Sequence, residues 1–323
     1  MTDLEALEAR VLGGEALGRE EGLTLAAQPL EPLCAAADRI RRHFCGNRFD
    51  LCTIISAKSG RCGENCRFCA QSAHYRTDAE EYPLLPPEEI AAKARSDWSR
   101  GVLRYSLVTS GRCLSDAEVD RACEAIRLIR ETCPIRVCVS MGLLTREQYA
   151  RLKAAGADRV HNNLEASARY FPSVCTTHTQ ADKLAAIRAA REAGLNVCSG
   201  GILGLGESMA DRIDLALTVR SLGVKSVPVN VLNPIPGTPF EKNPRLSEEE
   251  VRAVVAVFRF LLPDAAIRLA GGRGLMADHG RACFRSGANA AISGDMLTTA
   301  GYTVESDLRM LRELGYEPAL LDD

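Results

Sequence analysis

Three cysteines stand close together in the segment Lys58-Ser-Gly-Arg-Cys62-Gly-Glu-Asn-Cys66-Arg-Phe-Cys69. Their Cys-x3-Cys-x2-Cys spacing is compact enough for three thiolates to converge on one metal site, and glycines ease the turn. Three thiolates on a four-iron cluster leave one iron without a protein ligand. Such an iron can chelate the amino and carboxylate groups of S-adenosylmethionine (SAM) and pass an electron to its sulfonium. A four-iron cluster on these three cysteines could therefore make a radical from SAM.

A structural zinc site is the alternative interpretation of this segment, with His74 completing a Cys3His set. Thiolates suit both metals, so the spacing alone leaves this alternative open. The position of the segment disfavours it, because zinc knuckles are usually small self-contained units and these cysteines directly follow a predicted strand.

The cysteine content as a whole also points to metal or redox chemistry. Thirteen cysteines are an odd number in a 323-residue chain, which is too long to need disulfide staples. Cys138 and Cys198 lie inside apolar strand-like segments, where a single cysteine is usually a small buried hydrophobe. Arg268 also lies in such a segment, and its charge is costly there unless it is paired or bound to something.

Short β-rich runs alternate with helical patterns along most of the chain, which predicts an α/β fold. Helix 115–131 opens with a capping box, and another box opens helix 247–262; helices 145–155 and 180–193 each end at a glycine. Eight alternations are typical of a (β/α)8 TIM-type barrel, and an open doubly wound sheet is the alternative. The predicted strands are 51–57, 105–109, 136–141, 159–164, 196–200, 226–232, 267–270 and 290–293.

The barrel is expected to span residues 48–323 with a C-terminal helix, after an N-terminal helical extension at residues 1–47. The net charge of −2 gives no electrostatic reason to expect nucleic acid or an anionic membrane as a partner. The chain shows neither a secretory signal nor a transmembrane-length apolar run, so a cytoplasmic location is expected.

The three-cysteine loop resembles the signature of the radical SAM superfamily. By this resemblance, Phe68 would touch the adenine of SAM through its backbone. The glycine-rich segment 199–207 also resembles a SAM-binding stretch, with Ile202 against the adenine.

From about Arg48 to the C-terminus the chain is similar to the biotin synthase family, in which an auxiliary cluster deep in the barrel supplies the inserted sulfur. The motifs that carry this resemblance are Asp50-Leu-Cys-Thr-Ile-Ile-Ser-Ala-Lys-Ser-Gly60, Cys69-Ala-Gln-Ser72, His161-Asn-Asn-Leu-Glu165, Thr176-Thr-His-Thr179, Val197-Cys-Ser-Gly-Gly201, Pro236-Gly-Thr-Pro239 and Leu297-Thr-Thr299.

The chain departs from the better-known branch of that family, whose auxiliary [2Fe–2S] cluster has three cysteines and an arginine. Cys138, Cys198 and Arg268 match three of these ligands, but Ser106 replaces the remaining cysteine. Cys52 and Cys175 stand where that branch lacks cysteine. The resemblance to the second, anaerobe-associated branch favours a larger auxiliary cluster with an extra sulfide, held by Cys52, Cys138, Cys175 and Cys198, with Arg268 as a nearby charge partner. A [2Fe–2S] cluster using Ser106 or Cys52 is the alternative.

The family match also assigns roles to polar residues. Glu165 would bind the ribose of SAM, and Lys183 would pair with its carboxylate. Asn163 and Asn230 lie in apolar strands, where an unpaired amide is penalised, so they are candidates to bind the substrate. Further candidate pocket residues are Lys58, Thr298 and Thr299.

The implied activity is radical SAM-dependent sulfur insertion into dethiobiotin to form biotin, which makes the chain a sulfurtransferase. The expected cofactors are a [4Fe–4S] cluster, SAM and the auxiliary cluster, and the expected electron donor is a flavodoxin or ferredoxin. A homodimer is left open. The alternatives are a sister radical SAM enzyme, such as a hydrogenase maturase or an amino-acid mutase, and a non-catalytic zinc- or iron-binding module.

Overall fold

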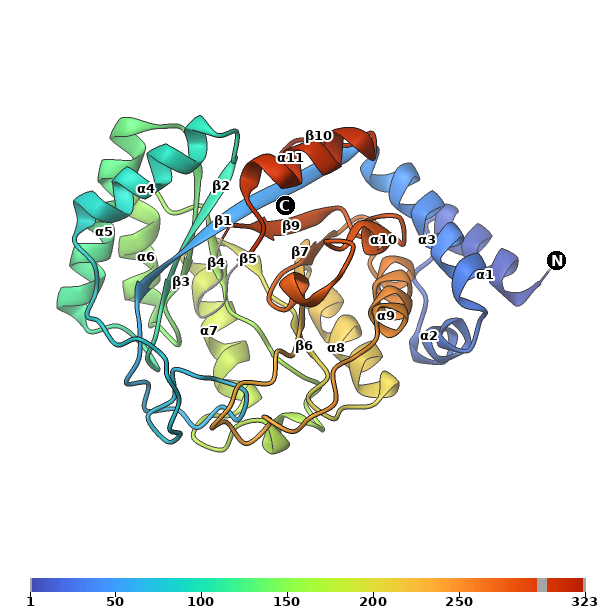
Figure 1. Cartoon of the computed structure of the whole chain (residues 1–323), viewed down its shortest axis with the longest axis horizontal. Coiled ribbons are helices and arrows are strands. Elements are labelled where there is room, and N and C mark those ends of the chain that lie inside the picture. The colour runs from blue at the N-terminus through green and yellow to red at the C-terminus, as the bar shows by residue number, and fades with distance from the viewer. Residues whose placement is uncertain (1, 295–300, 322–323) are drawn as a thin grey trace.

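The computed structural model describes residues 2–294 and 301–321. Eight parallel strands close into a barrel in the order β1-β2-β3-β4-β5-β7-β8-β9, with β9 paired back to β1 (Figure 1). This pairing confirms the predicted (β/α)8 barrel and excludes the open sheet. The strands are β1 (Arg48–Lys58), β2 (Arg104–Thr109), β3 (Arg136–Ser140), β4 (Arg159–His161), β5 (Asn196–Cys198), β6 (Gly201–Leu203), β7 (Ser226–Val231), β8 (Ala266–Leu269), β9 (Ala290–Ser293) and β10 (Glu317–Pro318).

The fifth barrel strand is divided into two short strands. Both β5 and β6 pair with β7, and residues 199–200 separate them. Gly200 lies so close to β7 that a Cβ atom there would be 2.0 Å from the carbonyl oxygen of Pro228. A side chain at this position would therefore push the two strands apart.

Helices cover the outside of the barrel and bury an apolar face against the strands. The capping boxes predicted at Ser115 and Ser247 are present, and Gly156 takes a left-handed conformation at the end of its helix. The α-helices are α1 (Asp3–Leu12), α2 (Arg19–Ala26), α3 (Leu30–Cys45), α4 (Pro87–Ser99), α5 (Asp116–Thr132), α6 (Arg146–Ala155), α7 (Gln180–Glu192), α8 (Met209–Ser221), α9 (Glu248–Leu261), α10 (Arg281–Phe284) and α11 (Val304–Glu313).

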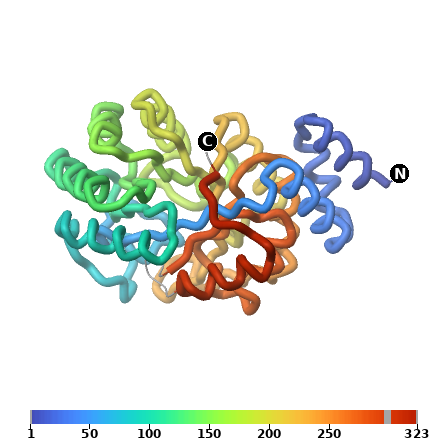
Figure 2. The backbone as a smooth tube through the Cα atoms, turned by 90° about the horizontal axis from the view of Figure 1, so that it is seen from above, coloured from blue at the N-terminus to red at the C-terminus, as the bar shows by residue number. Residues whose placement is uncertain are grey.

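The first three helices lie on one side of the barrel, as Figure 2 shows from above. Helix α3 packs on α9, and α2 packs on α8 and α9. Arg252 of α9 donates two hydrogen bonds of 2.9 Å each to the carboxylate of Glu31 on α3 and so joins these two helices at the surface. No helix in the described part of the chain has both the length and the apolar character needed to cross a membrane.

The two ends of the barrel differ in what they hold. The long loop 59–86 follows the carboxyl end of β1, as expected for the functional end of a barrel. At the other end, β10 pairs with the first residues of β1 and brings the C-terminal segment against the barrel floor (Figure 1).

Candidate metal and cofactor site

The three-cysteine loop is held in shape by its own backbone hydrogen bonds. The Cys62 N–H donates to Gln71 O over 3.0 Å, and the Ala73 N–H donates to Cys62 O over 2.8 Å. The residues Cys62, Cys66 and Cys69 are each partly exposed. Burial, and to a smaller extent the neighbouring Cys62, raises the pKa of Cys69 to about 11. A bound metal centre would supply the positive charge that these thiolates require.

The spacing of the loop sulfurs argues against a single zinc ion. A tetrahedral zinc ion with bonds of about 2.3 Å to sulfur needs ligand atoms within about 4 Å of one another. Within the described ranges, the one trio of such side chains whose ligand atoms all lie within 4.8 Å is Cys66, Cys175 and His178. The ring of His74 instead contacts Gly63 O at 3.0 Å. The three loop thiols do not form such a trio, so they do not surround a single ion as closely as zinc requires.

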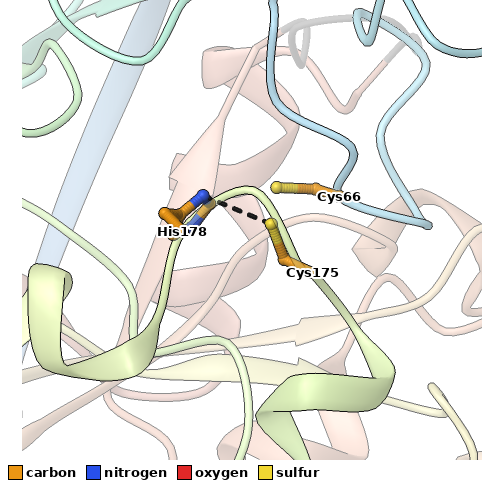
Figure 3. Close-up of side chains that lie close together, drawn as sticks. All are labelled: Cys66, Cys175 and His178. Carbon is orange, nitrogen blue, oxygen red and sulfur yellow. Dashed lines mark hydrogen bonds between the residues drawn. The ribbon is translucent and has the colours of Figure 1, made fainter.

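Cys175 does not line the cavity that holds the deep strand cysteines, with which it was predicted to bind the auxiliary cluster. It lies beside Cys66 on the loop between β4 and α7, with its Sγ 3.2 Å from His178 Nδ1 (Figure 3). The physical reason is that Asn65 binds this loop to the three-cysteine loop, its Oδ1 accepting from the Thr176 N–H at 2.9 Å. A hydrogen bond from the Cys66 thiol lowers the pKa of Cys175 to about 4.

The other three predicted auxiliary ligands converge deep in the barrel. Cys52, Cys138 and Cys198 belong to β1, β3 and β5 and line one cavity. Burial raises the pKa of Cys138 to about 12. Burial opposes ionisation of Cys198 as well, but a hydrogen bond with His161 and nearby positive charges lower its pKa to about 7.

A buried ionic network surrounds these thiols. The Nη1 atom of Arg268 donates to Cys52 Sγ over 3.2 Å, and its Nη2 lies 3.0 Å from Asp50 Oδ1. Arg104 also pairs with Asp50, at 3.3 Å. Burial opposes ionisation of Asp50, but Arg268, Arg104 and Arg159 lower its pKa to about 2. Three arginines against one carboxylate leave a positive excess that would stabilise an anionic cluster on thiolates.

One cavity of about 360 Å³ extends from Cys69 of the three-cysteine loop to the deep strand cysteines. Phe68 and Cys69 of the loop line it, and so do Cys52, Cys138 and Cys198 of the strands. A volume of this order accommodates a small organic molecule. A molecule bound next to Cys69 in this cavity would therefore have open space between it and the deep thiols.

The residues predicted to bind SAM lie near the loop cysteines. Phe68 and Ile202 belong to an apolar cluster that offers a surface for a flat ring. Glu165 lines the cavity in a left-handed conformation, with φ of 65°. Its Oε2 atom is buried and has no hydrogen-bond partner among the described residues, whereas Oε1 lies 3.8 Å from Lys183 Nζ. Such a carboxylate fits the hydroxyl groups of a ribose.

The predicted substrate residues fall into three groups. Asn163 and Asn230 line the cavity, and both also bind backbone groups. Asn163 Oδ1 accepts from the Gly200 N–H at 3.1 Å, and the Asn230 amide donates to Gly201 O at 3.0 Å and accepts from the Gly271 N–H at 2.9 Å. Lys58 does not line the described cavity, because its Nζ pairs with Glu118 Oε1 at 2.6 Å. Thr298 and Thr299 lie outside the described residues.

Several residues of the site were not predicted from the sequence. Arg104, Arg159 and His161 line the cavity, and Asp50 pairs with Arg104 and Arg268 beside it. His178 and Glu64 lie beside Cys175. The sequence did hold a signal that could have identified Asp50, Arg104 and Arg159. Each is a charged residue in an apolar strand pattern, as Arg268 is.

Fold and site together define a radical SAM enzyme: residues 57–219 match the Radical SAM superfamily, and residues 228–317 match the Biotin and Thiamin Synthesis associated domain. The chain is 59% identical over 317 residues to biotin synthase of Akkermansia muciniphila, covering 98% of this chain and 99% of the relative. It is 55% identical over 321 residues to biotin synthase 2 of Corynebacterium diphtheriae, covering 99% and 97%. The chain therefore belongs to the biotin synthase family, which confirms the resemblance found in the sequence.

Solved structures of other enzymes share the fold. Methylornithine synthase superposes with a TM-score of 0.85 at 22% identity, covering 98% of each chain. A maturase of the [FeFe]-hydrogenase superposes with a TM-score of 0.83 at 19% identity, covering 98% of this chain and 75% of the other. At these identities the likeness supports the barrel alone.

Proposed function

We propose that the chain converts dethiobiotin to biotin by radical insertion of sulfur. When bound, the two clusters and SAM would supply a 5′-deoxyadenosyl radical and the sulfur atom that enters the substrate. The observation that carries this proposal is the single cavity between the loop cysteines and the deep thiols. A substrate held there would have the source of the radical on one side and the source of sulfur on the other.

Cys62, Cys66 and Cys69 are the proposed ligands of the [4Fe–4S] cluster that binds SAM. Phe68 and Ile202 would hold the adenine, Glu165 the ribose and Lys183 the carboxylate. The unpartnered Oε2 of Glu165 supports this assignment, since a buried acceptor without a donor is costly until a ligand supplies one.

Cys52, Cys138 and Cys198 are the proposed ligands of the auxiliary cluster, with Arg268 as a charge partner. We favour the four-iron cluster of the second branch, because three thiolates leave one iron free for the extra sulfide. The Arg268 guanidinium faces the Asp50 carboxylate and donates to the Asp50 and Ala291 carbonyl oxygens at 2.9 and 3.1 Å. These contacts favour a charge partner over a metal ligand and thus disfavour the [2Fe–2S] alternative.

The chain's own residues would position the substrate and exclude water. Asn163 and Asn230 would face the ring of dethiobiotin, and Asn230 would do so while fixing the loop after β8. The apolar walls around Ile54 and Ile292 leave few partners for water, which protects a carbon radical from side reactions.

Anaerobic reconstitution with iron and sulfide tests the proposal. Mössbauer spectra of the wild type should show two clusters, and SAM with dethiobiotin should give biotin and 5′-deoxyadenosine. Cys62→Ala should abolish SAM cleavage, while Cys52→Ala should retain it without forming biotin. SAM cleavage by the wild type without biotin would instead indicate a sister radical enzyme.

The remaining assignments are also proposals. None of the thirteen cysteines, all of which the structure describes, forms a disulfide, which suits the cytoplasm and a flavodoxin or ferredoxin as electron donor. Residues 1–47 form the proposed helical extension, and residues 48–323 the catalytic barrel. Light scattering of the purified protein will test the homodimer.

A further inference from the structure

A second group of metal-binding side chains lies at the mouth of the barrel. It consists of Cys66, Cys175 and His178, whose ligand atoms all lie within 4.8 Å of one another (Figure 3). Cys175 and His178 are buried, and Cys66 is partly so. Figure 3 shows that Cys66 comes from the three-cysteine loop and the other two from the loop before α7.

The two loops are held together without any metal. The Asn65 N–H donates to Thr177 Oγ1 at 3.1 Å, and its side chain accepts from the Thr176 and Thr177 N–H groups at 2.9 and 3.2 Å. The Arg67 N–H donates to Val174 O at 2.9 Å. The three ligand atoms are therefore placed in advance, and little chain entropy would be lost when an ion binds.

The spacing fits a single small ion. A tetrahedral ion with bonds of about 2.3 Å to sulfur and about 2.0 Å to nitrogen holds these atoms about 3.5 Å apart. The Sγ of Cys175 lies 3.2 Å from Nδ1 of His178. An atom set of two sulfurs and one imidazole nitrogen selects thiophilic divalent ions, zinc foremost.

A carboxylate completes the surroundings. The Oε2 atom of Glu64 lies 2.5 Å from His178 Nδ1 and accepts from Thr177 Oγ1 at 2.6 Å. Glu64 does not belong to the group whose ligand atoms all lie within 4.8 Å of one another, so it would lie beside the ion and not serve as one of the three ligands. The carboxylate also offsets the charge of the ion.

We propose that Cys66, Cys175 and His178 bind a single thiophilic divalent cation of the zinc type in the cluster-free protein. This inference rests on the proposed function, because Cys66 is there a ligand of the SAM-binding cluster. One thiol cannot serve both centres, so the ion would compete with assembly of that cluster. The auxiliary cluster would be unaffected.

Cobalt(II) added anaerobically to the full-length cluster-free protein tests this site. Tetrahedral d–d bands and a thiolate-to-cobalt charge-transfer band are expected at one equivalent, and zinc should displace them. Cys175→Ser and His178→Ala should weaken binding by more than about 100-fold, because each removes a direct ligand. Circular dichroism will verify that both variants are folded.

Cys62→Ala and Cys69→Ala are matched controls on the same loop. They should keep the cobalt spectrum and lose the SAM-binding cluster, whereas Cys175→Ser should lose the cobalt spectrum and keep that cluster. Equal loss of the cobalt spectrum in Cys62→Ala and Cys175→Ser would overturn the metal site without touching the proposed function. A SAM-binding cluster that survives Cys62→Ala would overturn the proposed function and leave the metal site standing.

Discussion

Arg268 donates to the thiol of Cys52 at the barrel floor, and Asp50 faces the same guanidinium. Cys138 and Cys198 complete a ring of thiols drawn from three strands. Because the thiols are buried, their ionisation depends on the surrounding positive charge, which the three arginines supply. At this scale, charge compensation decides whether the floor can hold an anionic cluster.

Cysteine variants separate the two metal centres. We expect Cys52→Ala, Cys138→Ala and Cys198→Ala each to lose the auxiliary cluster, because each removes one of three thiolates. Cys175→Ala and Ser106→Ala should retain it. Mössbauer spectra after identical reconstitution measure this, and loss of the auxiliary cluster in Cys175→Ala would restore the four-thiolate set.

Asp50→Asn should destabilise the cluster-free protein by about 3 kcal/mol at pH 7, because it leaves the buried arginines without their counter-charge. The folded-state pKa of Asp50, about 2, lies below its ordinary value of 3.8. Its ionised form therefore adds stability of about 2 kcal/mol that is complete above that ordinary value and is lost as pH falls toward 2.

Urea denaturation of wild type and Asp50→Asn between pH 7 and pH 2 checks both expectations. Between pH 4 and pH 2 the variant should not lose the roughly 2 kcal/mol of stability that ionised Asp50 gives the wild type. Asp264→Asn is the control, since Asp264 pairs with Lys225 at the surface, 2.5 Å apart, and should change stability by less than about 1 kcal/mol. Equal effects of the two substitutions would contradict the role given to Asp50.

The division between β5 and β6 connects strand geometry to SAM binding. The Ile202 N–H donates to Glu165 O at 2.8 Å, and a Cβ atom on Gly201 would lie 2.4 Å from the same oxygen. The absence of a side chain at residue 201 therefore fixes where Glu165 sits. The start of strand β6 at Gly201 thus sets the position of Glu165, which is proposed to bind the ribose of SAM.

Gly201→Ala should weaken SAM binding by about 10- to 100-fold, because it displaces Glu165 by an appreciable fraction of an ångström. Equilibrium binding of SAM to the reconstituted protein measures the change, and iron content should stay at the wild-type level. Gly63→Ala is a suitable control, since a Cβ atom there meets nothing within 4 Å. Unchanged SAM affinity in Gly201→Ala would refute this link.

The C-terminal segment closes the barrel floor beneath the deep thiols. The Leu321 N–H donates to Asp50 Oδ2 at 3.3 Å, and its carbonyl accepts from Arg159 at 3.4 Å. Its side chain packs with Ala266 and Ala290. The first strand of the barrel and the C-terminal segment thus meet at Asp50, the residue that pairs with Arg268.

Deletion of residues 319–323 should open the floor and expose Cys52, which is 5% accessible in the intact chain. We expect at least about tenfold faster alkylation of Cys52 in the cluster-free protein, because reaction requires access to the thiolate. Peptide mass spectrometry measures the rate. Deletion of residues 322–323 alone is the matched control, and equal rates in the two variants would show that the segment does not close the floor.

The sequence by itself determined the features that depend on nearby residues. The cysteine spacing, the capping boxes and the strand–helix alternation are patterns of residues that lie near one another along the chain. They predicted the three-cysteine loop and the barrel. They did not predict strand β10 or the break in the fifth barrel strand at Gly200. Only the tertiary structure decided which distant cysteines share a site. The barrel strands place Cys52 and Cys198 in the lining of one cavity, and hydrogen bonds of Asn65 hold Cys175 beside Cys66 instead. Such groupings depend on how separate segments pack, which spacing along the chain does not encode.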